Sequence, residues 1–143
     1  MVQRARNRRN RWPSRQHAFD RFRGKSIFRG LPDEALWDYV KYGLLETENG
    51  RVQLRFDREW EAQIYAHPPL DIWETIPQLT VPTLAIRGEH SDTVSQESWQ
   101  RWQALQPEAR FVQLAGTGHL APLERPLEIA RLMHDFLEEV LGP

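Results

Sequence analysis

The sequence predicts an α/β fold, and three observations support this prediction. A continuous apolar run over residues 81–86 is typical of a strand that is buried on both faces of a parallel sheet. A second apolar strand is predicted over residues 109–114. Between them lies a helix capped by Ser95, with apolar positions at Trp99, Trp102 and Leu105. This order predicts a βαβ unit of roughly thirty residues, with parallel strands and a right-handed crossover.

The first half of the chain predicts small helices joined by loops. Ser14 caps a helix that ends near Gly24, and a second helix opens at Leu31-Pro32-Asp33-Glu34. Asp57 caps a third helix, which stops before His67-Pro68-Pro69 because proline disfavours helical backbone at the residue before it. Between the second and third helices, the alternating pattern of residues 51–56 predicts either a short extended segment or an edge loop.

The composition changes at Pro68-Pro69, and we place a domain boundary there. Residues 1–69 form one part of the chain and residues 70–143 the other. In the second part, Asp71 caps a helix that reaches about Leu79. The last predicted helix starts at Pro126 and carries a wide apolar stripe that ends at Leu141.

Composition excludes several classes of protein. The chain has 143 residues, of which 40% are apolar and 27% charged, which is ordinary for a globular domain. No apolar run approaches the length of about 20 residues that a membrane span needs, so we expect no membrane association. The absence of cysteine excludes disulfides, thiolate zinc sites and a cysteine nucleophile within these residues. This usage fits a reducing compartment, and we expect a cytoplasmic location.

Charge is distributed unevenly along the chain. Residues 1–25 hold nine basic groups and one acid, Asp20, a balance of +8, and the remainder holds ten basic and nineteen acidic groups, a balance of −9. The arginine-rich start could serve as an arm for nucleic acid or an anionic surface. It lacks the interleaved aromatic residues of single-strand binders. We therefore favour a solvated helical face that docks on the acidic remainder, and do not expect nucleic-acid binding.

His119 is the strongest candidate for a catalytic residue. It follows the predicted strand 109–114 in the sequence Gly116-Thr117-Gly118-His119, and the two glycines permit backbone conformations that project the ring off the sheet. Catalytic groups of open α/β sheets lie beyond the carboxyl ends of the strands. A histidine in this position can act as a general base.

Asp92 is the predicted acidic partner of His119. It lies in the loop after the strand 81–86, and parallel neighbouring strands, about 4.8 Å apart, bring their carboxyl ends to one edge. Its carboxylate would accept a hydrogen bond from one ring nitrogen and leave the other for a nucleophile. Glu89 is a competing acid in the same loop. The alternative for Asp92 is a turn residue or a cap of the following helix.

No other residues predict a ligand site. His17, His67 and His134 lack partners at metal-ligand spacing, and no cluster of His, Asp or Glu indicates a metal. Gly116-Thr117-Gly118 lacks the third glycine and the downstream acid of a dinucleotide site. We therefore expect no cofactor.

Two segments, Val81–Val94 and Gly116–Pro126, resemble the C-terminal third of an α/β-hydrolase. The resemblance is specific from about Ile76 to Leu141 and implies the acid role for Asp92 and the base role for His119. More loosely, Ser14–Gly43 and Asp57–Tyr65 resemble the helical cap of these enzymes. The implied fold is a partial α/β-hydrolase: a helical cap portion in residues 1–69, and the last two parallel core strands with flanking helices in residues 70–143.

The nucleophile of this family is not found in the chain. The family places it in Gly-x-Ser-x-Gly, upstream of the cap, and none of the five serines lies in such an elbow: Ser14, Ser26, Ser91, Ser95 and Ser98. We therefore expect an N-terminally truncated hydrolase that is inactive by itself. Two parallel strands would also leave an exposed sheet edge, so we expect self-association through it.

Three functions remain open at this point. The first is hydrolysis of an ester-like bond in a small molecule by a nucleophile–His–Asp triad. The second is epoxide or carbon–halogen cleavage, in which an upstream aspartate would be the nucleophile. The third is a non-catalytic binding or interaction module derived from a hydrolase.

Overall fold

The structure, a computed structural model, describes residues 1–142 and divides the chain into two compact units. One unit runs from Met1 to Pro69 and the other begins at Leu70, at the same boundary that the composition predicts. None of the helices in residues 1–142 is long and apolar enough to cross a membrane.

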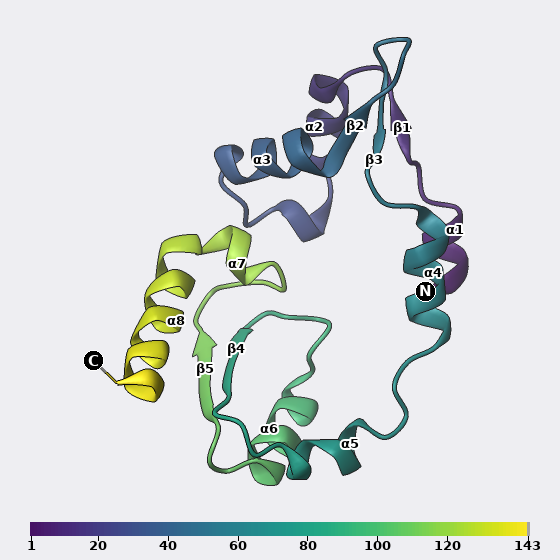
Figure 1. Cartoon of the computed structure of the whole chain (residues 1–143). Coiled ribbons are helices and arrows are strands. Elements are labelled where there is room, and N and C mark those ends of the chain that lie inside the picture. The colour runs from purple at the N-terminus through teal and green to yellow at the C-terminus, as the bar shows by residue number, and fades with distance from the viewer. Residues whose placement is uncertain (143) are drawn as a thin grey trace. The chain divides into compact units, whose positions relative to one another are not determined.

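The first unit combines four α-helices with a small antiparallel sheet (Figure 1). The helices are α1 (Val2–Arg6), α2 (Arg15–Arg23), α3 (Asp33–Gly43) and α4 (Arg58–Ala66), with a 3₁₀ turn, η1, at Ser26–Phe28. The strands β1 (Arg11–Trp12), β2 (Leu44–Glu46) and β3 (Val52–Leu54) pair in the order β1-β3-β2. The prediction of helices for this half is thus confirmed, but the expectation of loops between them missed two of the three strands.

Aromatic and aliphatic side chains from α2 and α3 form the core of this unit. Phe22 is 1% exposed, and its ring lies 5.2–5.6 Å from the rings of Trp12, Phe28 and Tyr39. Leu36 and Val40, one turn apart on α3, are fully buried. Most aromatic residues of this unit therefore pack in its core, which is the usual role of aromatic side chains. Trp60, which is 73% exposed, is an exception.

Ion pairs join the arginine-rich start to the acidic residues of the same unit. Arg6 contacts Glu59 through two nitrogens, at 2.9 and 2.7 Å. Three further pairs are Arg8–Glu61, Arg15–Glu46 and Arg23–Asp33. The interpretation that basic residues dock on the acidic remainder is confirmed for these four arginines.

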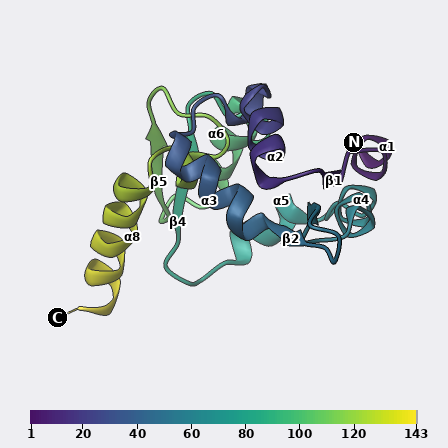
Figure 2. The same ribbon diagram turned by 90° about the horizontal axis from the view of Figure 1, so that it is seen from above.

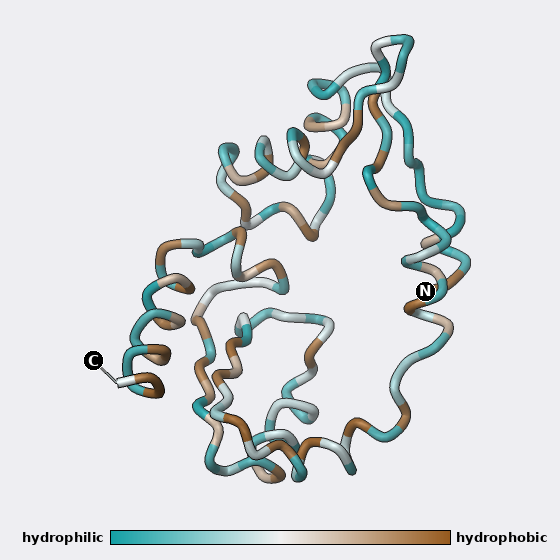
Figure 3. The backbone as a smooth tube through the Cα atoms, viewed as in Figure 1, coloured by the Kyte–Doolittle hydropathy of each residue, from teal (hydrophilic) through white to brown (hydrophobic). Residues whose placement is uncertain are grey.

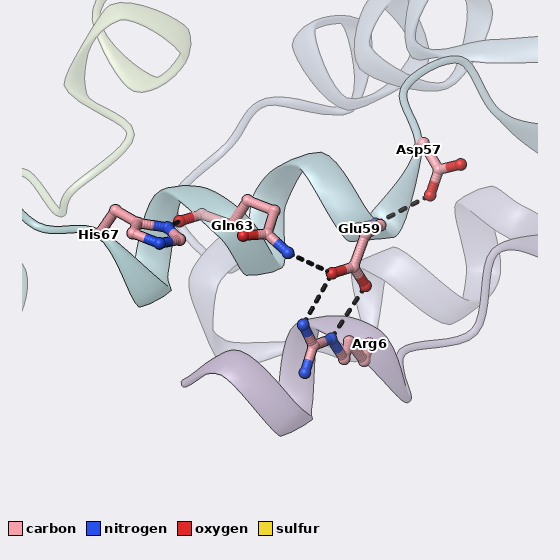
Figure 4. A network of polar contacts seen from close by, with 5 residues as sticks. All are labelled: Arg6, Asp57, Glu59, Gln63 and His67. Atoms are coloured by element: carbon pink, nitrogen blue, oxygen red, sulfur yellow. Dashed lines mark hydrogen bonds and ion pairs between the residues drawn. The ribbon is translucent and has the colours of Figure 1, made fainter.

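Glu59 lies at the centre of a polar network that joins α1 to α4 (Figure 4). Its backbone N–H donates to Asp57, the predicted cap, at 2.8 Å, and its carboxylate accepts from Gln63 at 2.6 Å. Hydrogen bonds from Arg6, then from Gln63, lower the pKa of Glu59 to about 2. The ionised carboxylate is the form that these donors stabilise.

The second unit is the predicted βαβ arrangement. Its elements are α5 (Ile72–Thr75), the 3₁₀ turn η2 (Ile76–Gln78), β4 (Leu84–Gly88), α6 (Gln96–Leu105), β5 (Arg110–Leu114), α7 (Ala121–Glu124) and α8 (Pro126–Leu141). Strands β4 and β5 are parallel, and Ile86 is paired with Val112. Pro82 delays β4 relative to its predicted start at 81, because proline lacks the N–H that a ladder requires. Pro77 likewise divides the predicted helix 71–79.

Helices cover both faces of the β4–β5 pair (Figures 1 and 2). On one face, Trp99 and Trp102 of α6 meet the ring of Phe111 edge-on, at 5.1 and 5.6 Å. On the other face, Ile129 of α8 packs with Leu114 and Ala121. Alternation along β5 places Phe111 and Leu114 on opposite faces. Figure 3 shows apolar residues along both strands, and both apolar and polar residues within the turns of α8, on opposite sides of the helix.

The Glu59 network predicts a pH-dependent contribution to stability. Because the folded-state pKa lies below the unfolded value, its contribution is present above about pH 4.3 and is lost as pH falls toward 2. We expect Glu59→Gln to lower the melting temperature at pH 7. The difference in melting temperature between this variant and the wild type should become smaller as the pH falls from about 4.3 toward 2. Thermal unfolding followed by circular dichroism measures both melting temperatures. Glu48→Gln, at an exposed position in the β2–β3 turn, is the control and should show no such trend.

Candidate active site

His119 lies where the sequence predicts it, beyond the carboxyl end of β5. Gly116 adopts φ +65°, in the left-handed region that favours glycine, and reverses the chain after the strand. Its N–H donates to the carboxylate of Glu89 at 2.7 Å. Glu124 of α7 accepts from the N–H of Gly118 at 2.9 Å. Two carboxylates thus hold the backbone of the loop that carries His119, which assigns structural roles to Glu89 and Glu124.

The loops after β4 and β5 are tied together by main-chain hydrogen bonds. The N–H of Glu89 donates to the carbonyl of Leu114, and the N–H of His90 donates to the carbonyl of Thr117, both at 2.9 Å. Thr117 is 1% exposed, although it lies in a loop. Parallel pairing therefore continues past the ends of the strands, and the two candidate site loops form one framework.

Gly88 is essential to this framework because the two loops touch at its α-carbon. A Cβ atom at this position would overlap the carbonyl oxygens of Gly118 and Thr117. Both are backbone atoms and cannot move independently of the loop. Only glycine permits this approach.

Ser91 is the residue that contacts the ring of His119. Its Oγ lies 3.1 Å from Nδ1, and the side chain is buried, whereas the ring is exposed. The same Oγ accepts a hydrogen bond from the N–H of Val94 at 3.3 Å. Sequence reasoning assigned no role to Ser91. The one available signal was its position beside Asp92, in the loop opposite His119.

Asp92 follows Ser91 in the same loop and is exposed. Its side-chain oxygen Oδ1 accepts a hydrogen bond from the hydroxyl of Thr93 at 3.4 Å. Across residues 1–142, the hydrogen bonds do not include one between Asp92 and His119. The structure therefore brings the predicted acid to the correct end of the sheet, while Ser91 occupies the ring nitrogen. The pairing of Asp92 with His119 stays a prediction.

Arg87 anchors the loop that carries Ser91 and Asp92. It is 6% exposed, and its guanidinium donates to the carbonyl of Val94 at 2.8 Å and to the side chains of Gln113 and Gln96 at 2.6 and 3.0 Å. A buried charge is tolerated where hydrogen bonds satisfy it. A charged residue inside an otherwise apolar strand was the signal in the sequence that could have identified this role.

A groove of about 560 Å³ extends from His119 along β4 and α8. Its lining is mostly apolar, and Arg87, Ser91 and His119 contribute the polar side chains. The apolar lining includes Leu84, Ile86, Ile129, Met133, Phe136 and Leu137. In the part of the chain that the structure describes, β4 pairs with β5 alone, so its other edge is unpaired. Within residues 1–142 this edge of β4 has no strand partner, and an apolar groove adjoins it.

The prediction that His134 lacks partners at metal-ligand spacing is wrong, because residues 1–142 contain one group of side chains with that spacing. His134, Asp135 and Glu138 lie on α8, and one ligand atom from each falls within 4.8 Å of the others. All three are 64–72% exposed at the side chain, and His134 faces the two carboxylates at 3.6 and 3.9 Å. Groups of this kind are typical of a solvated helix face.

The chain belongs to the alpha/beta hydrolase family, whose model it matches over residues 2–132. Among curated proteins it is 27% identical to the uncharacterized hydrolase YugF of Bacillus subtilis over 128 residues, which are 90% of this chain and 44% of that protein. It is 31% identical to the esterase YbfF of Escherichia coli over 87 residues, 58% of this chain and 34% of that protein.

Solved structures show the same likeness. E-2-(acetamidomethylene)succinate hydrolase superposes with a TM-score of 0.84 at 18% identity, over 96% of this chain and 50% of that one. An α/β hydrolase from Novosphingobium aromaticivorans gives 0.77 at 26% identity, over 97% of this chain and 52% of that one. The chain thus spans about half the length, or less, of these relatives. The predicted family and the partial α/β-hydrolase fold are confirmed.

The contact at Gly88 predicts a severe effect of a single methyl group. We expect Gly88→Ala to destabilise the second unit by about 3 kcal/mol, the upper end for overpacking, because the methyl would meet fixed backbone atoms. Urea unfolding measures the change. Gly43→Ala is the matched control, since a Cβ there meets nothing within 4 Å. Equal stability of the two variants would contradict the structural role of Gly88.

Proposed function

We propose that this chain carries the acid and base of a hydrolase that cleaves ester-like bonds in small molecules. The observation that supports the proposal most directly is that the loops of His119 and Asp92 leave the same ends of two parallel strands and are bonded to each other. Membership of the alpha/beta hydrolase family and the likeness to an esterase agree with it. The substrate, the triad and the two residue roles are parts of the proposal.

In the proposed reaction, His119 first accepts a proton and then donates it. Its Nε2 accepts the proton of a serine hydroxyl as the oxygen attacks the ester carbonyl, and then donates that proton to the leaving alcohol. Water repeats the cycle on the acyl-enzyme. Asp92 accepts a hydrogen bond from Nδ1–H, which keeps Nε2 free and stabilises the imidazolium.

The nucleophile is proposed to come from a part of the hydrolase fold that residues 1–143 do not include. No serine of the chain lies in a Gly-x-Ser-x-Gly elbow, and the solved relatives contain about as much chain again as the matched part. By this proposal residues 1–69 are the cap portion and residues 70–143 the C-terminal part of the core, and the chain is inactive alone. An aspartate nucleophile would instead give epoxide or carbon–halogen cleavage.

A non-catalytic binding module is the second candidate. The specific observation that favours it is the contact of His119 with the hydroxyl of Ser91 in place of a carboxylate. Relics of a triad lose their geometry once catalysis is no longer required. Activity measurements separate the two candidates.

A chimera tests the proposed hydrolase. Residues 1–143 are joined to the part of the hydrolase YugF that the match does not cover, because that match includes 90% of this chain, and turnover of p-nitrophenyl butyrate is measured. We expect the chimera to be active, and His119→Ala to lower kcat by about 10²–10⁴-fold, as loss of a general base does. Asp92→Asn should also lower kcat.

His90→Ala is the control for the chimera, because His90 is an exposed histidine of the adjacent loop. It should leave kcat unchanged. A folded, active chimera whose turnover does not depend on His119 would contradict the hydrolase proposal. The same assay on residues 1–143 alone should give no turnover above the uncatalysed rate.

We also propose that the chain associates with a second copy of itself through the unpaired edge of β4. Two β4 strands paired about a two-fold axis would make a four-stranded sheet, with one α8 over each strand pair. In such a sheet the two α8 helices would lie two strand spacings apart, which is about 9.6 Å. This distance matches the 8–10 Å between the axes of packed helices. The exposed apolar residues Met133 and Leu137, both lining the groove, would then be covered.

Leu137→Lys is expected to weaken this association. The charged side chain would replace an apolar contact in the groove, where Leu137 is 49% exposed in the single chain. Sedimentation velocity measures the fraction of dimer. Leu127→Lys, at a 72% exposed leucine of α8 outside the groove, should not change it. A wild-type chain that is monomeric at high concentration would contradict the proposed dimer.

A further inference from the structure

We infer that Ser91 is a positioning residue that selects the tautomer of His119, and that it competes with Asp92 for the same ring nitrogen. This inference rests on the proposed function, because it concerns the residue proposed as the base. Three observations carry it: the 3.1 Å contact between Ser91 Oγ and Nδ1, the burial of Ser91, and its second hydrogen bond.

The hydrogen bonds around Ser91 determine where its proton lies. A hydroxyl has one hydrogen to donate and two lone pairs that accept. The backbone N–H of Val94 can only donate, so it occupies one lone pair of Oγ. The other polar contact of Oγ is with Nδ1 of His119. Because buried polar hydrogens are paired, the hydroxyl donates to Nδ1.

This arrangement fixes the tautomer of the neutral ring. A ring nitrogen that accepts a hydrogen bond carries no proton, so the proton of the neutral imidazole is on Nε2. In this state Nε2 is a donor and cannot accept a proton from a nucleophile. The ring held by Ser91 is therefore a resting form of the proposed base.

A carboxylate on Nδ1 has the opposite effect. An ionised carboxylate can only accept, so it requires Nδ1–H and leaves Nε2 as the acceptor. Asp92 is the adjacent residue, is exposed, and is engaged by a single long contact of 3.4 Å. Ser91, by contrast, is held at both the main chain and the side chain, since its N–H donates to Gly88 at 3.1 Å. When the carboxylate of Asp92 replaces the hydroxyl of Ser91 as the partner of Nδ1, the ring thus changes from the resting tautomer to the tautomer whose Nε2 can accept a proton.

Nitrogen NMR of the complete chain tests this inference without a substrate or a nucleophile. The protein is labelled with ¹⁵N, and long-range ¹H–¹⁵N spectra are recorded at about pH 9, above the ordinary titration range of imidazole. Protonated and unprotonated ring nitrogens have well-separated ¹⁵N shifts. The wild-type ring should show Nε2 protonated and Nδ1 unprotonated.

Three variants and one control separate positioning from a general structural effect. Ser91→Ala should change the ratio of the two tautomers about tenfold toward Nδ1–H, as expected when one hydrogen bond is exchanged for another. Adding Asp92→Asn to Ser91→Ala should abolish that change, because the amide is a weaker acceptor. Ser91→Thr retains the hydroxyl and should retain the wild-type tautomer. Ser95→Ala, which removes the cap of α6, is the matched control and should leave the ring signals unchanged.

Two results would overturn the inference. One is a wild-type spectrum in which Nδ1 of His119 is protonated. This test needs no variant, so it can be made even if Ser91→Ala does not fold. The other is a Ser91→Ala protein that is folded and has the wild-type tautomer ratio. Neither result bears on turnover by the chimera, so failure of this inference and failure of the proposed hydrolase function are distinguishable.

Discussion

The contact between two backbones at Gly88 is the constraint on which the candidate site depends. The loops that follow β4 and β5 touch at its α-carbon, where a side chain would overlap the carbonyls of Thr117 and Gly118. Beside this contact, the N–H groups of Glu89 and His90 donate to the carbonyls of Leu114, at the end of β5, and Thr117 in the following loop. Buried Arg87 then holds the far end of the first loop, at Val94. The position of Ser91 against His119 follows from these main-chain contacts, so the geometry of the site is a property of the framework as well as of the side chains.

The site has a polar end and an apolar side, and the two have different origins. The polar end, at Ser91 and His119, is complete within the second unit and is held by local hydrogen bonds. The apolar side adjoins a strand edge without a partner, and belongs to a fold of which the chain spans about half in its solved relatives. The contact between Ser91 and His119 is therefore formed within one half of the fold, whereas the apolar groove lies beside a strand edge that has no partner in residues 1–142.

The features that sequence could predict are those encoded by local patterns. The βαβ unit follows from two apolar runs and one helical period, and Ser14, Asp57 and Ser95 cap helices as predicted because a cap depends on its nearest neighbours. The small sheet of the first unit was missed because strands of two or three residues show no period. The contact between Ser91 and His119 joins residues 28 apart, and a change of one residue in the loop decides whether a hydroxyl or a carboxylate meets the ring. Such a choice depends on backbone geometry that composition and spacing do not specify.

The two units close chain loops of different length, and this affects the order in which they can form. The contact of Arg87 with Gln113 spans 26 residues, whereas that of Arg6 with Glu59 spans 53. Each doubling of loop length adds only about 0.6 kcal/mol to the entropy of closure, so the difference matters little at equilibrium. It matters more for kinetics, because longer-range contacts slow folding. During synthesis, the ion pairs of Arg6 and Arg8 with α4 can form only after Glu59 and Glu61 have been added to the chain, so the charges of these two arginines stay uncompensated by α4 until then.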